Sequence, residues 1–473
     1  MDVRGEAAVT PVRRGWSTAL VLAGAMFLVL FDSLAVATAL PAIGDEFGLS
    51  PGRLQWVVTL YSLSIGGFLV LGGRVCDLWG RRRTMVASLA LTAVGLLVAG
   101  VAPGAGPLLA GRVMQGVGAA FAIPAALASA GTLFPEEPWR SRVFSVVASA
   151  ANTAGIAGAV GGGLITSLLG WRWLFLIVVP VAVIAVVVAL RVLPPDAPGE
   201  TWRGLDVGGA VLVTGGLVAV IHGAGQVGER GPGAGALLPV LAGLAMLGAL
   251  VRWERRAAAP LIKPSVVRSR RLTACCLAFA AHSAAYSAVV VVGSLALQER
   301  HGLSAAQAGL ALAPMLVSAL ISAVPASALV RRYGTRAVAA TALLVCSASL
   351  ALAGSQADDG PVPVIIVCLA VWGLSGGPIY VALTRSAVVD AAPADRGVAS
   401  ALFESTSHVG GAISVAVFLS MIGAGAGYGG AQLLGAAVSV AGVLALLTIV
   451  PPGRSDRGTS AKPGDHAAAR ADR

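Results

Sequence analysis

Long apolar runs, separated by short polar or charged stretches, repeat along the whole chain. Most runs reach the roughly 20 residues that a helix needs to cross a hydrocarbon core of about 30 Å. Gly, Ala and Ser alternate with branched residues, which suits close packing of helices in lipid, and the alternation typical of membrane β-barrels is missing. The pattern predicts an all-α membrane bundle with fourteen spans: 17–40, 54–73, 84–101, 107–133, 143–168, 171–190, 205–222, 235–252, 272–297, 305–329, 336–354, 362–384, 398–421 and 431–450.

Two hydrophilic stretches divide these spans into groups of six, two and six. The first, Arg191 to Arg203, contains three prolines, and the second, Arg252 to Arg271, is basic. We expect a cytoplasmic N-terminus, an N-terminal six-helix bundle, a linker region with two extra helices, a C-terminal six-helix bundle and a disordered cytoplasmic tail. Their predicted bounds are 1–16, 17–190, 191–271, 272–450 and 451–473.

The first six and the last six spans contain similar segments at corresponding places. Segment 73–82, after the second span, aligns with segment 327–336, after the tenth. The tenth span is the second helix of the last six, so the echo is in register. Internal repeats of this kind are how secondary transporters build a site between two rocking halves.

Composition excludes a soluble globular protein. Of the 473 residues, 57% are hydrophobic and only 12% are charged, with a mean hydropathy of +0.85. The first span is too long for the apolar region of a cleaved signal peptide, and no small-residue cleavage site follows it. We therefore expect the first span to stay in the membrane.

The net charge of +11 indicates lipid rather than nucleic acid as the partner, because the charges lie in short loops beside the membrane. If the N-terminus is inside, most Lys and Arg residues lie in cytoplasmic segments and only four lie in outer loops, while Arg112 lies within a span. These four are Arg53, Arg172, Arg230 and Arg300. The asymmetry predicts a multi-pass plasma-membrane protein with both termini in the cytoplasm.

No residue pattern indicates an enzyme, a metal site or a cofactor. The cysteines have neither metal-ligand spacing nor a partner in an outer loop, so we interpret them as packing residues: Cys76, Cys275, Cys276, Cys346 and Cys368. A phosphate-binding Gly-x-x-x-x-Gly-Lys-Ser/Thr sequence is missing, which argues against an ATP-driven pump.

One charged turn carries a family resemblance. GGRVCDLWGRRR, residues 72–83, is similar to motif A of the major facilitator superfamily, and nearly the whole chain resembles its fourteen-helix drug:proton antiporter branch. The resemblance implies two six-helix bundles with two additional central helices, and a gating role for this turn. In that role a glycine lets two helices approach and the aspartate pairs with arginines in one conformation only. The implied gating residues are Gly73, Asp77, Gly80, Arg81 and Arg82. The alternative is a positively charged cytoplasmic anchor alone.

Other segments resemble the same branch with departures. Segments 30–41, 54–63 and 170–180 are similar to its first, second and sixth helices, but Ala37 and Val178 stand where the branch usually has Asn. The motif C region has Ala159 in place of the usual proline, which leaves the direction of transport open. It keeps the helix-packing glycines Gly155, Gly158, Gly162 and Gly163.

LAGRVMQGVGAA, residues 109–120, resembles motif B of the fourth helix, whose arginine is held to take part in proton coupling. Arg112 lies roughly 8 Å and Asp32 roughly 12 Å from the outer ends of their spans, at 1.5 Å per residue. A lone charge at the bilayer centre costs about 2.5 to 3.5 kcal/mol, so we expect the two side chains to pair. Arg112 would hold Asp32 ionised until a substrate or a conformational change separates them. The alternative for Arg112 is snorkelling to the outer headgroups.

The last six spans add three titratable side chains to the predicted proton-coupling set. His282 and His408 lie near mid-membrane, and Glu404 and His408 share one helical face, where they can hydrogen-bond or share a proton. The alternative for His282 is a buried neutral ring bonded to a backbone carbonyl. Compared with the branch, Glu404 replaces a usual Asn, His408 a usual Gln and Ser407 a usual Arg.

Further aromatic and polar side chains lie on helices expected to face a central cavity. Aromatic faces suit flat or cationic drugs, although each of these residues could equally serve packing. The predicted substrate-cavity residues are Tyr61, Gln115, Tyr286, Trp372 and Tyr380.

The sequence thus favours a monomeric proton-coupled antiporter that exports hydrophobic or cationic small molecules, such as drugs or antibiotics, by alternating access. Its expected partners are the small-molecule substrate, protons and membrane lipid, with no nucleic acid. Two alternatives stay open, because one fold serves many functions. They are a transporter of an endogenous metabolite and a membrane sensor with the same fold but no transport.

Overall fold

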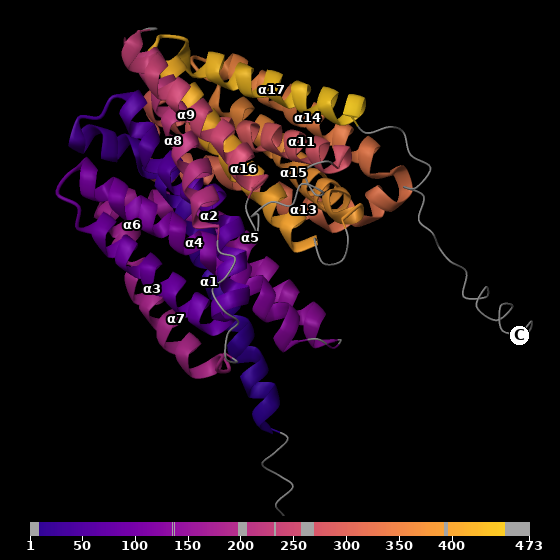
Figure 1. Ribbon diagram of the computed structural model, residues 1–473. Helices are drawn as coiled ribbons and strands as arrows, with labels where there is room; N and C mark the ends of the chain where they lie inside the picture. The colour runs from indigo at the N-terminus through magenta and orange to yellow at the C-terminus, as the bar shows by residue number, and fades with distance from the viewer. Residues whose placement is uncertain are drawn as a thin grey trace, which may run out of the picture.

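The computed structural model describes residues 9–134, 136, 138–196, 206–230, 233–256, 269–391 and 396–449. Within these ranges every regular element is a helix (Figure 1). Thirteen helical stretches are long and apolar enough to cross a membrane, and a shorter apolar helix, Gly208–Gly223, occupies the predicted place of the seventh span. The predicted all-α architecture with fourteen spans is confirmed.

The helices fall into a first half, a middle pair and a second half. The first half holds α1 (Val9–Phe47), α2 (Pro51–Trp79), α3 (Arg81–Gly100), α4 (Ala105–Leu133), α5 (Trp139–Leu169), α6 (Arg172–Leu176) and α7 (Val178–Val192). The middle pair is α8 (Val207–Arg230) and α9 (Ala234–Glu254). The second half holds α11 (Arg270–Ser287), η1 (Ala288–Val292), α12 (Gly293–Glu299), α13 (Ala305–Tyr333), α14 (Thr335–Gln356), α15 (Val362–Val389), α16 (Arg396–Gly423) and α17 (Gly427–Ile449).

Three predicted boundaries differ from the structure. Helix α1 starts at Val9, so part of the predicted N-terminal segment 1–16 is helical. The sixth span is divided into α6 and α7 at Ile177, and the ninth contains the π-helical turn η1 over the valine-rich run 288–292. The predicted tail 451–473 lies outside the described residues.

Two helix pairs form the main contacts between the halves, α2 with α16 and α5 with α13, and α1 makes smaller contacts with α12, α13 and η1. Helices α8 and α9 pack on each other, and α8 also contacts α2 and α16 (Figure 1). The middle pair therefore borders one seam between the halves and is absent from the other. In each seam the second helix of one half packs against the fifth helix of the other, as expected of two related halves that rock about a central site.

Loops gather on two opposite faces. We call arginine-poor the face formed by loops 48–50, 101–104, 170–171, 300–304, 357–361 and 424–426, and arginine-rich the opposite face. Two hydrogen bonds join the halves within the described chain. Gln298 Nε2 donates to the Thr38 carbonyl over 3.2 Å, and the Ala306 amide donates to Ser167 Oγ over 3.1 Å. Both lie toward the arginine-poor face, so the halves are closed on that side.

The repeat is visible in two turns on the arginine-rich face. Gly80 joins α2 to α3 with φ 106°, and Gly334 joins α13 to α14 with φ 81°. Positive φ is accessible to glycine without the steric cost that a Cβ brings. These are the glycines that align in the echoed segments of the sequence.

Candidate functional site

Arg112 is buried almost completely, with 1% of its surface exposed, which is rare for a charged side chain. The glycines around it in α4 explain its position. A Cβ at Gly111 would lie 2.7 Å from the Gly95 carbonyl of α3, and one at Gly116 would lie 2.5 Å from the Tyr61 carbonyl of α2. Without side chains at these positions α4 packs tightly against both neighbours, which holds the guanidinium among helices and away from lipid.

The guanidinium of Arg112 forms an ion pair with Asp32 of α1. Nη1 lies 2.5 Å from Asp32 Oδ2 and also donates to Gln115 Oε1. Nε donates to the Val57 carbonyl of α2 over 2.8 Å. The pair thus fastens three helices together. The predicted contact is present, and snorkelling of Arg112 is ruled out by its burial.

Tyr61 covers one face of this guanidinium. The Arg112 Cζ atom lies 4.3 Å from the centre of the ring, and the Tyr61 hydroxyl donates to the Val29 carbonyl of α1 over 2.8 Å. The aromatic face and the hydrogen bonds partly offset the cost of removing two charges from water. Tyr61 and Gln115, which we predicted to line the substrate cavity, are buried contacts of Arg112 here.

Asp32 is the less enclosed partner of the pair. It retains 7% exposure, against 1% for Arg112. A carboxylate that is paired yet not sealed can gain a proton when the local packing changes, whereas a guanidinium cannot lose one in a protein. Asp32 is therefore the member of the pair that can change charge.

The motif A turn, Gly80–Arg83, is held by an aspartate that sequence reasoning missed. Both carboxylate oxygens of Asp196 accept hydrogen bonds of 2.9 Å, one from the Arg82 amide and one from the Arg83 amide. These amides belong to the first turn of α3, where backbone donors lack helical partners and a negative charge is favourable. A Cβ on Gly80 would overlap the Asp196 side chain. The only hint in the sequence was an acid shortly after the prolines that end the sixth span.

The other predicted gating residues have separate surroundings in this conformation. Asp77 is exposed and forms no ion pair within the described ranges. The close helix approach occurs at Gly72, where a Cβ would overlap the backbone of Ala120, and not at Gly73, where it would meet only ordinary contact at 3.8 Å. Arg81 Nη1 donates to Thr132 Oγ1 over 2.6 Å, and Arg82 donates to the Leu190 carbonyl. The two arginines thus connect α3 to α4 and α7.

The four motif C glycines lie at helix contacts of α5. Gly158 and Gly162 face α1, where added Cβ atoms would lie 2.5 Å from backbone atoms of Phe31 and Ala35. Gly155 is also next to α1, at 3.3 Å from Leu34. Gly163 faces the other half, against the backbone of Ala305 in α13. This glycine row therefore joins α1 within the first half and α13 across one seam.

An aromatic stack occupies the second half. The His282 ring lies 5.2 Å from the Trp372 ring with 10° between the planes, and Phe279 continues the stack onto Phe403 at 4.2 Å. Tyr286 contacts the other end, 5.9 Å from Trp372. Both His282 Nδ1 and Trp372 Nε1 are buried without a hydrogen-bond partner in the part of the chain described. A polar ligand or water can supply the hydrogen-bond partner of each atom.

Glu404 of α16 is connected to α15. Its Oε1 accepts a hydrogen bond of 3.0 Å from the Tyr380 hydroxyl, and Tyr380 is 47% exposed. No hydrogen bond joins Glu404 to His408 within the described residues, because the carboxylate is directed to the tyrosine of the neighbouring helix. His408 instead lies at the seam with α2, where its Cβ is close to Gly66. The three titratable groups predicted in this half therefore occupy separate surroundings.

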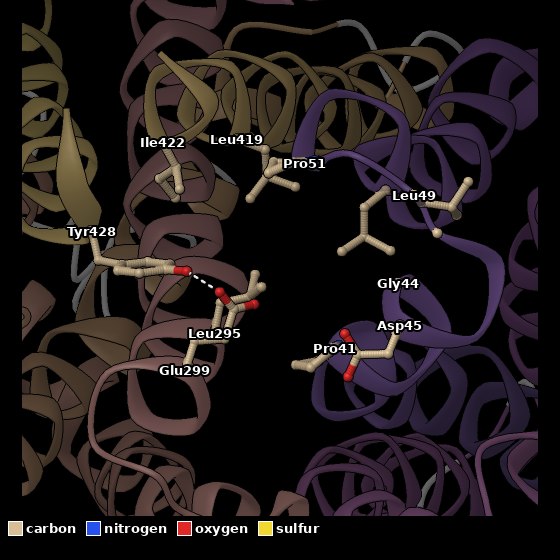
Figure 2. Close-up of a pocket in the computed structure, with 12 residues that line it drawn as sticks. Pro41, Gly44, Asp45, Leu49, Pro51, Leu295, Glu299, Leu419, Ile422 and Tyr428 are labelled. Atoms are coloured by element: carbon tan, nitrogen blue, oxygen red, sulfur yellow. Dashed lines mark hydrogen bonds between the residues drawn. The ribbon is translucent and has the colours of Figure 1, made fainter. Parts of the chain in front are cut away.

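The closed face keeps a hollow between the halves. A pocket of about 420 Å³ is lined by the α1–α2 connection on one side and by α12, α16 and α17 on the other (Figure 2). Leu49, Leu295 and Ile422 contribute apolar walls, while Asp45 and Glu299 contribute carboxylates. The closure on the arginine-poor face is thus incomplete and carries negative charge.

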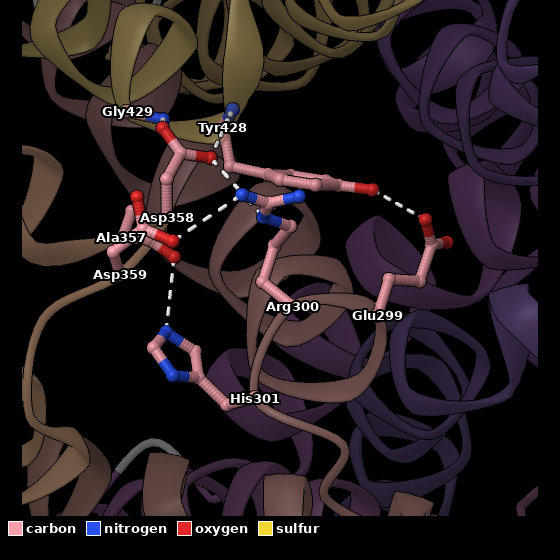
Figure 3. A network of polar contacts seen from close by, with 8 residues as sticks. All are labelled: Glu299, Arg300, His301, Ala357, Asp358, Asp359, Tyr428 and Gly429. Carbon is pink, nitrogen blue, oxygen red and sulfur yellow. Dashed lines mark hydrogen bonds and ion pairs between the residues drawn. The ribbon is translucent and has the colours of Figure 1, made fainter.

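Arg300, one of the four predicted outer arginines, ties the second half together beside this pocket (Figure 3). Its guanidinium lies 3.4 Å from Asp359 and 3.9 Å from Asp358. The Asp358 carboxylate also accepts from the Tyr428 and Gly429 amides at the start of α17. Arg300 therefore helps to connect α12 with α17. The Glu299 carboxylate adds a second connection, because it accepts a hydrogen bond from the Tyr428 hydroxyl.

Comparison with known proteins places these features in a family. The model of the Major Facilitator Superfamily matches residues 22–274 and 274–471. A cephamycin export protein of Amycolatopsis lactamdurans is 34% identical over 92% of this chain and 92% of its own length. A puromycin resistance protein of Streptomyces alboniger is 34% identical over 88% and 82%, and a lincomycin resistance protein of Streptomyces lincolnensis is 32% identical over 93% of each.

Solved structures share the fold at low sequence identity. A crystal structure of the nucleoside transporter NupG superposes with a TM-score of 0.65 at 11% identity, covering 93% of this chain and all of that one. A POT family transporter in complex with a thioalcohol-conjugated peptide gives 0.70 at 13% identity, covering 92% and 95%. At such identities the likeness concerns the fold alone.

Proposed function

Because the chain belongs to the major facilitator superfamily, we propose that it is a proton-coupled antiporter that exports a hydrophobic or cationic small molecule. The chain is a multi-pass membrane protein whose relatives include antibiotic export and resistance proteins. The proposed cargo, a hydrophobic or cationic small molecule, is a broader class than the antibiotics that the names of those relatives give. The single observation that carries proton coupling is the buried ion pair between Asp32 and Arg112.

In the coupling step Arg112 loses or regains its ion pair with Asp32. With Asp32 ionised, the pair ties α1 to α4 and, through the Val57 carbonyl, to α2. Protonation of Asp32 removes the charge attraction, while Arg112 keeps its bonds to Val57 and Gln115. Helix α1 is then freed to move relative to α4. A proton that enters on one side and leaves on the other thereby biases the equilibrium between the two orientations of the halves.

We propose that the arginine-poor face is outside, in line with the positive-inside rule. The halves are closed on that face, by Gln298 with Thr38 and Ala306 with Ser167. In this orientation the side that these contacts close is the outer one, as loading of cargo from the cytoplasm requires. Release would require both hydrogen bonds to break, and they are few and weak enough for a rocking motion.

The second half supplies the proposed cargo contacts. Tyr380 presents an exposed aromatic face, and its hydroxyl is bonded to the Glu404 carboxylate. An aromatic face beside a carboxylate attracts an organic cation. Removing the charge of Glu404 while keeping its shape should therefore affect cationic cargo more than neutral cargo.

The proposal is tested with the full chain in proteoliposomes under an imposed pH gradient, with a fluorescent lipophilic cation as cargo. Proton-coupled export predicts uphill flux that an uncoupler abolishes. Flux that persists with the uncoupler would remove proton coupling. No flux of any drug-like compound, with flux of a metabolite, would favour the metabolite transporter, and no flux at all would favour the sensor.

Glu404→Gln is expected to weaken transport of cationic cargo by roughly 5- to 30-fold in apparent KM, the scale of one desolvated cation–aromatic or charge contact. Neutral hydrophobic cargo should change by less than about twofold in the same assay. The measurement is concentration-dependent uptake of one cationic and one neutral fluorescent compound. Equal losses for both compounds would show that Glu404 acts on the transport cycle and not on cargo charge.

Asp196→Ala should lower stability by about 1 kcal/mol, because the first turn of α3 loses its carboxylate cap. Asp77→Ala should leave stability within about 0.5 kcal/mol, since Asp77 is exposed. Thermal unfolding of the purified variants distinguishes the two. If the turn is a gate, both changes slow transport and leave the ranking of inhibitors unchanged. A shifted inhibitor ranking for either variant would count against gating.

A further inference from the structure

The middle helix pair carries a hollow of its own. A pocket of about 740 Å³ lies between α8 and α9 at their arginine-rich end. Its walls are apolar and its rim is cationic, formed by Val211, Leu212, Ala249 and Trp253 and by Arg252 and Arg256. Only 11% of the membrane-crossing window of α9 is buried, so this helix faces lipid over most of its length.

The tryptophan wall of this hollow is fixed by its neighbours. Asp206, itself 8% exposed, accepts 2.7 Å hydrogen bonds from Trp253 Nε1 and from the Gly209 amide. A Cβ on Gly208 would lie 2.8 Å from the indole ring, so glycine is what lets the ring lie against α8. The other side of the ring stays open, and Trp253 is 50% exposed. The indole is therefore held in place by α8 and keeps the hollow open.

The rim charges have no acidic partner in the described structure. Neither Arg252 nor Arg256 forms an ion pair or a side-chain hydrogen bond within the described ranges. A guanidinium presents several donors that match phosphate oxygens in geometry and charge. Two of them one helical turn apart, next to an apolar hollow in a lipid-facing surface, complement a molecule with a phosphate and a long apolar chain.

We propose that this hollow binds one anionic phospholipid. Arg252 and Arg256 contact its phosphate and headgroup, and one acyl chain lies along Trp253 and Val211. A zwitterionic phospholipid fits the same walls but brings a cationic headgroup to two arginines, so it binds less well. The lipid would anchor the α8–α9 pair, which contacts α2 and α16 at one seam between the halves.

The test is lipid binding to the purified full chain, measured by native mass spectrometry with phosphatidylglycerol or phosphatidylcholine of identical acyl chains. The unaltered protein should retain phosphatidylglycerol preferentially. In the double variant Arg252→Gln/Arg256→Gln that preference should fall roughly tenfold or more, given the attraction of each arginine for anionic lipid. Arg255→Gln is the matched control, because Arg255 is exposed on the same helix end and does not line the hollow.

Two further measurements separate binding through the acyl chain from binding through the phosphate headgroup. Trp253→Ala should weaken retention of both lipids, since it removes the apolar wall and no charge. Glycerol phosphate, which has the headgroup chemistry and no acyl chain, should not compete at concentrations that saturate a phosphate site. Equal retention of the two lipids by the unaltered protein, an equal loss in Arg255→Gln, or full competition by glycerol phosphate would each overturn the proposal. The readout is binding, so it is independent of whether the protein transports anything.

Discussion

Asp32→Asn is expected to reduce export driven by a pH gradient strongly. Asparagine keeps the size of the side chain and can still accept a hydrogen bond from Arg112, but it cannot exchange a proton. Gradient-driven flux should fall by about 5- to 150-fold, the range that corresponds to a coupling free energy of roughly 1 to 3 kcal/mol. Counterflow, in which labelled cargo exchanges with unlabelled cargo without a gradient, should persist. Both fluxes are measured on the same proteoliposomes.

The matched control is Asp359→Asn, which neutralises a carboxylate that is 90% exposed on the arginine-poor face. Surface ion pairs of this kind contribute little, so uphill export should be unchanged. Uphill export at the unaltered level in Asp32→Asn would remove this aspartate from the coupling mechanism. Loss of counterflow together with uphill export would instead indicate that Asp32 is needed for any movement of the halves.

Arg112→Ala should be the most destabilising single change at the site. It leaves the Asp32 carboxylate without its cationic partner among packed helices, and breaking a buried pair from one side costs about 3 to 5 kcal/mol. The loss should shrink as the pH is lowered, because a protonated carboxyl needs no cation beside it. All five cysteines are buried and free, so a thiol-reactive dye reports the unfolding transition directly.

A double-mutant cycle separates the ion pair from simple packing. In Asp32→Asn/Arg112→Ala no buried charge is left unpaired, so the double variant should be more stable than Arg112→Ala alone. Arg53→Ala, which removes an exposed arginine at the start of α2, should leave the transition unchanged. A double variant as unstable as the sum of the two single changes would show that the side chains do not interact energetically.

The number and order of the membrane helices could be predicted from the sequence, because in lipid the backbone must satisfy its own hydrogen bonds and a span has a minimum apolar length. Boundaries were less certain. Helix α1 begins at Val9, before the predicted span, and the sixth span divides at Ile177. Hydropathy excludes segment 9–16 from the span because it contains Arg13 and Arg14, although the helix continues through it. The division at Ile177 lies within an apolar run and therefore has no polar signal.

The pairing of Asp32 and Arg112 could also be predicted, because two isolated charges at similar depth are costly unless they meet. The hydrogen bond between Glu404 and Tyr380 was not predicted. Spacing along one helix favoured His408 as the neighbour of Glu404, whereas the rotamer turns the carboxylate to α15. Contacts within a helix follow from its period, but contacts between helices depend on their rotation about their axes.

The sequence by itself determined that this chain forms a membrane bundle of helices in two related halves with a middle pair, and that a charged pair lies inside it. Length, hydropathy and the cost of unpaired charge in lipid suffice for those conclusions. Only the tertiary structure decided that Asp196 caps α3, that Gly72 and not Gly73 is the close contact, and that the closed face is the arginine-poor one. These features depend on which segments, distant along the chain, come within a few ångströms of each other, and local pattern carries no information about that.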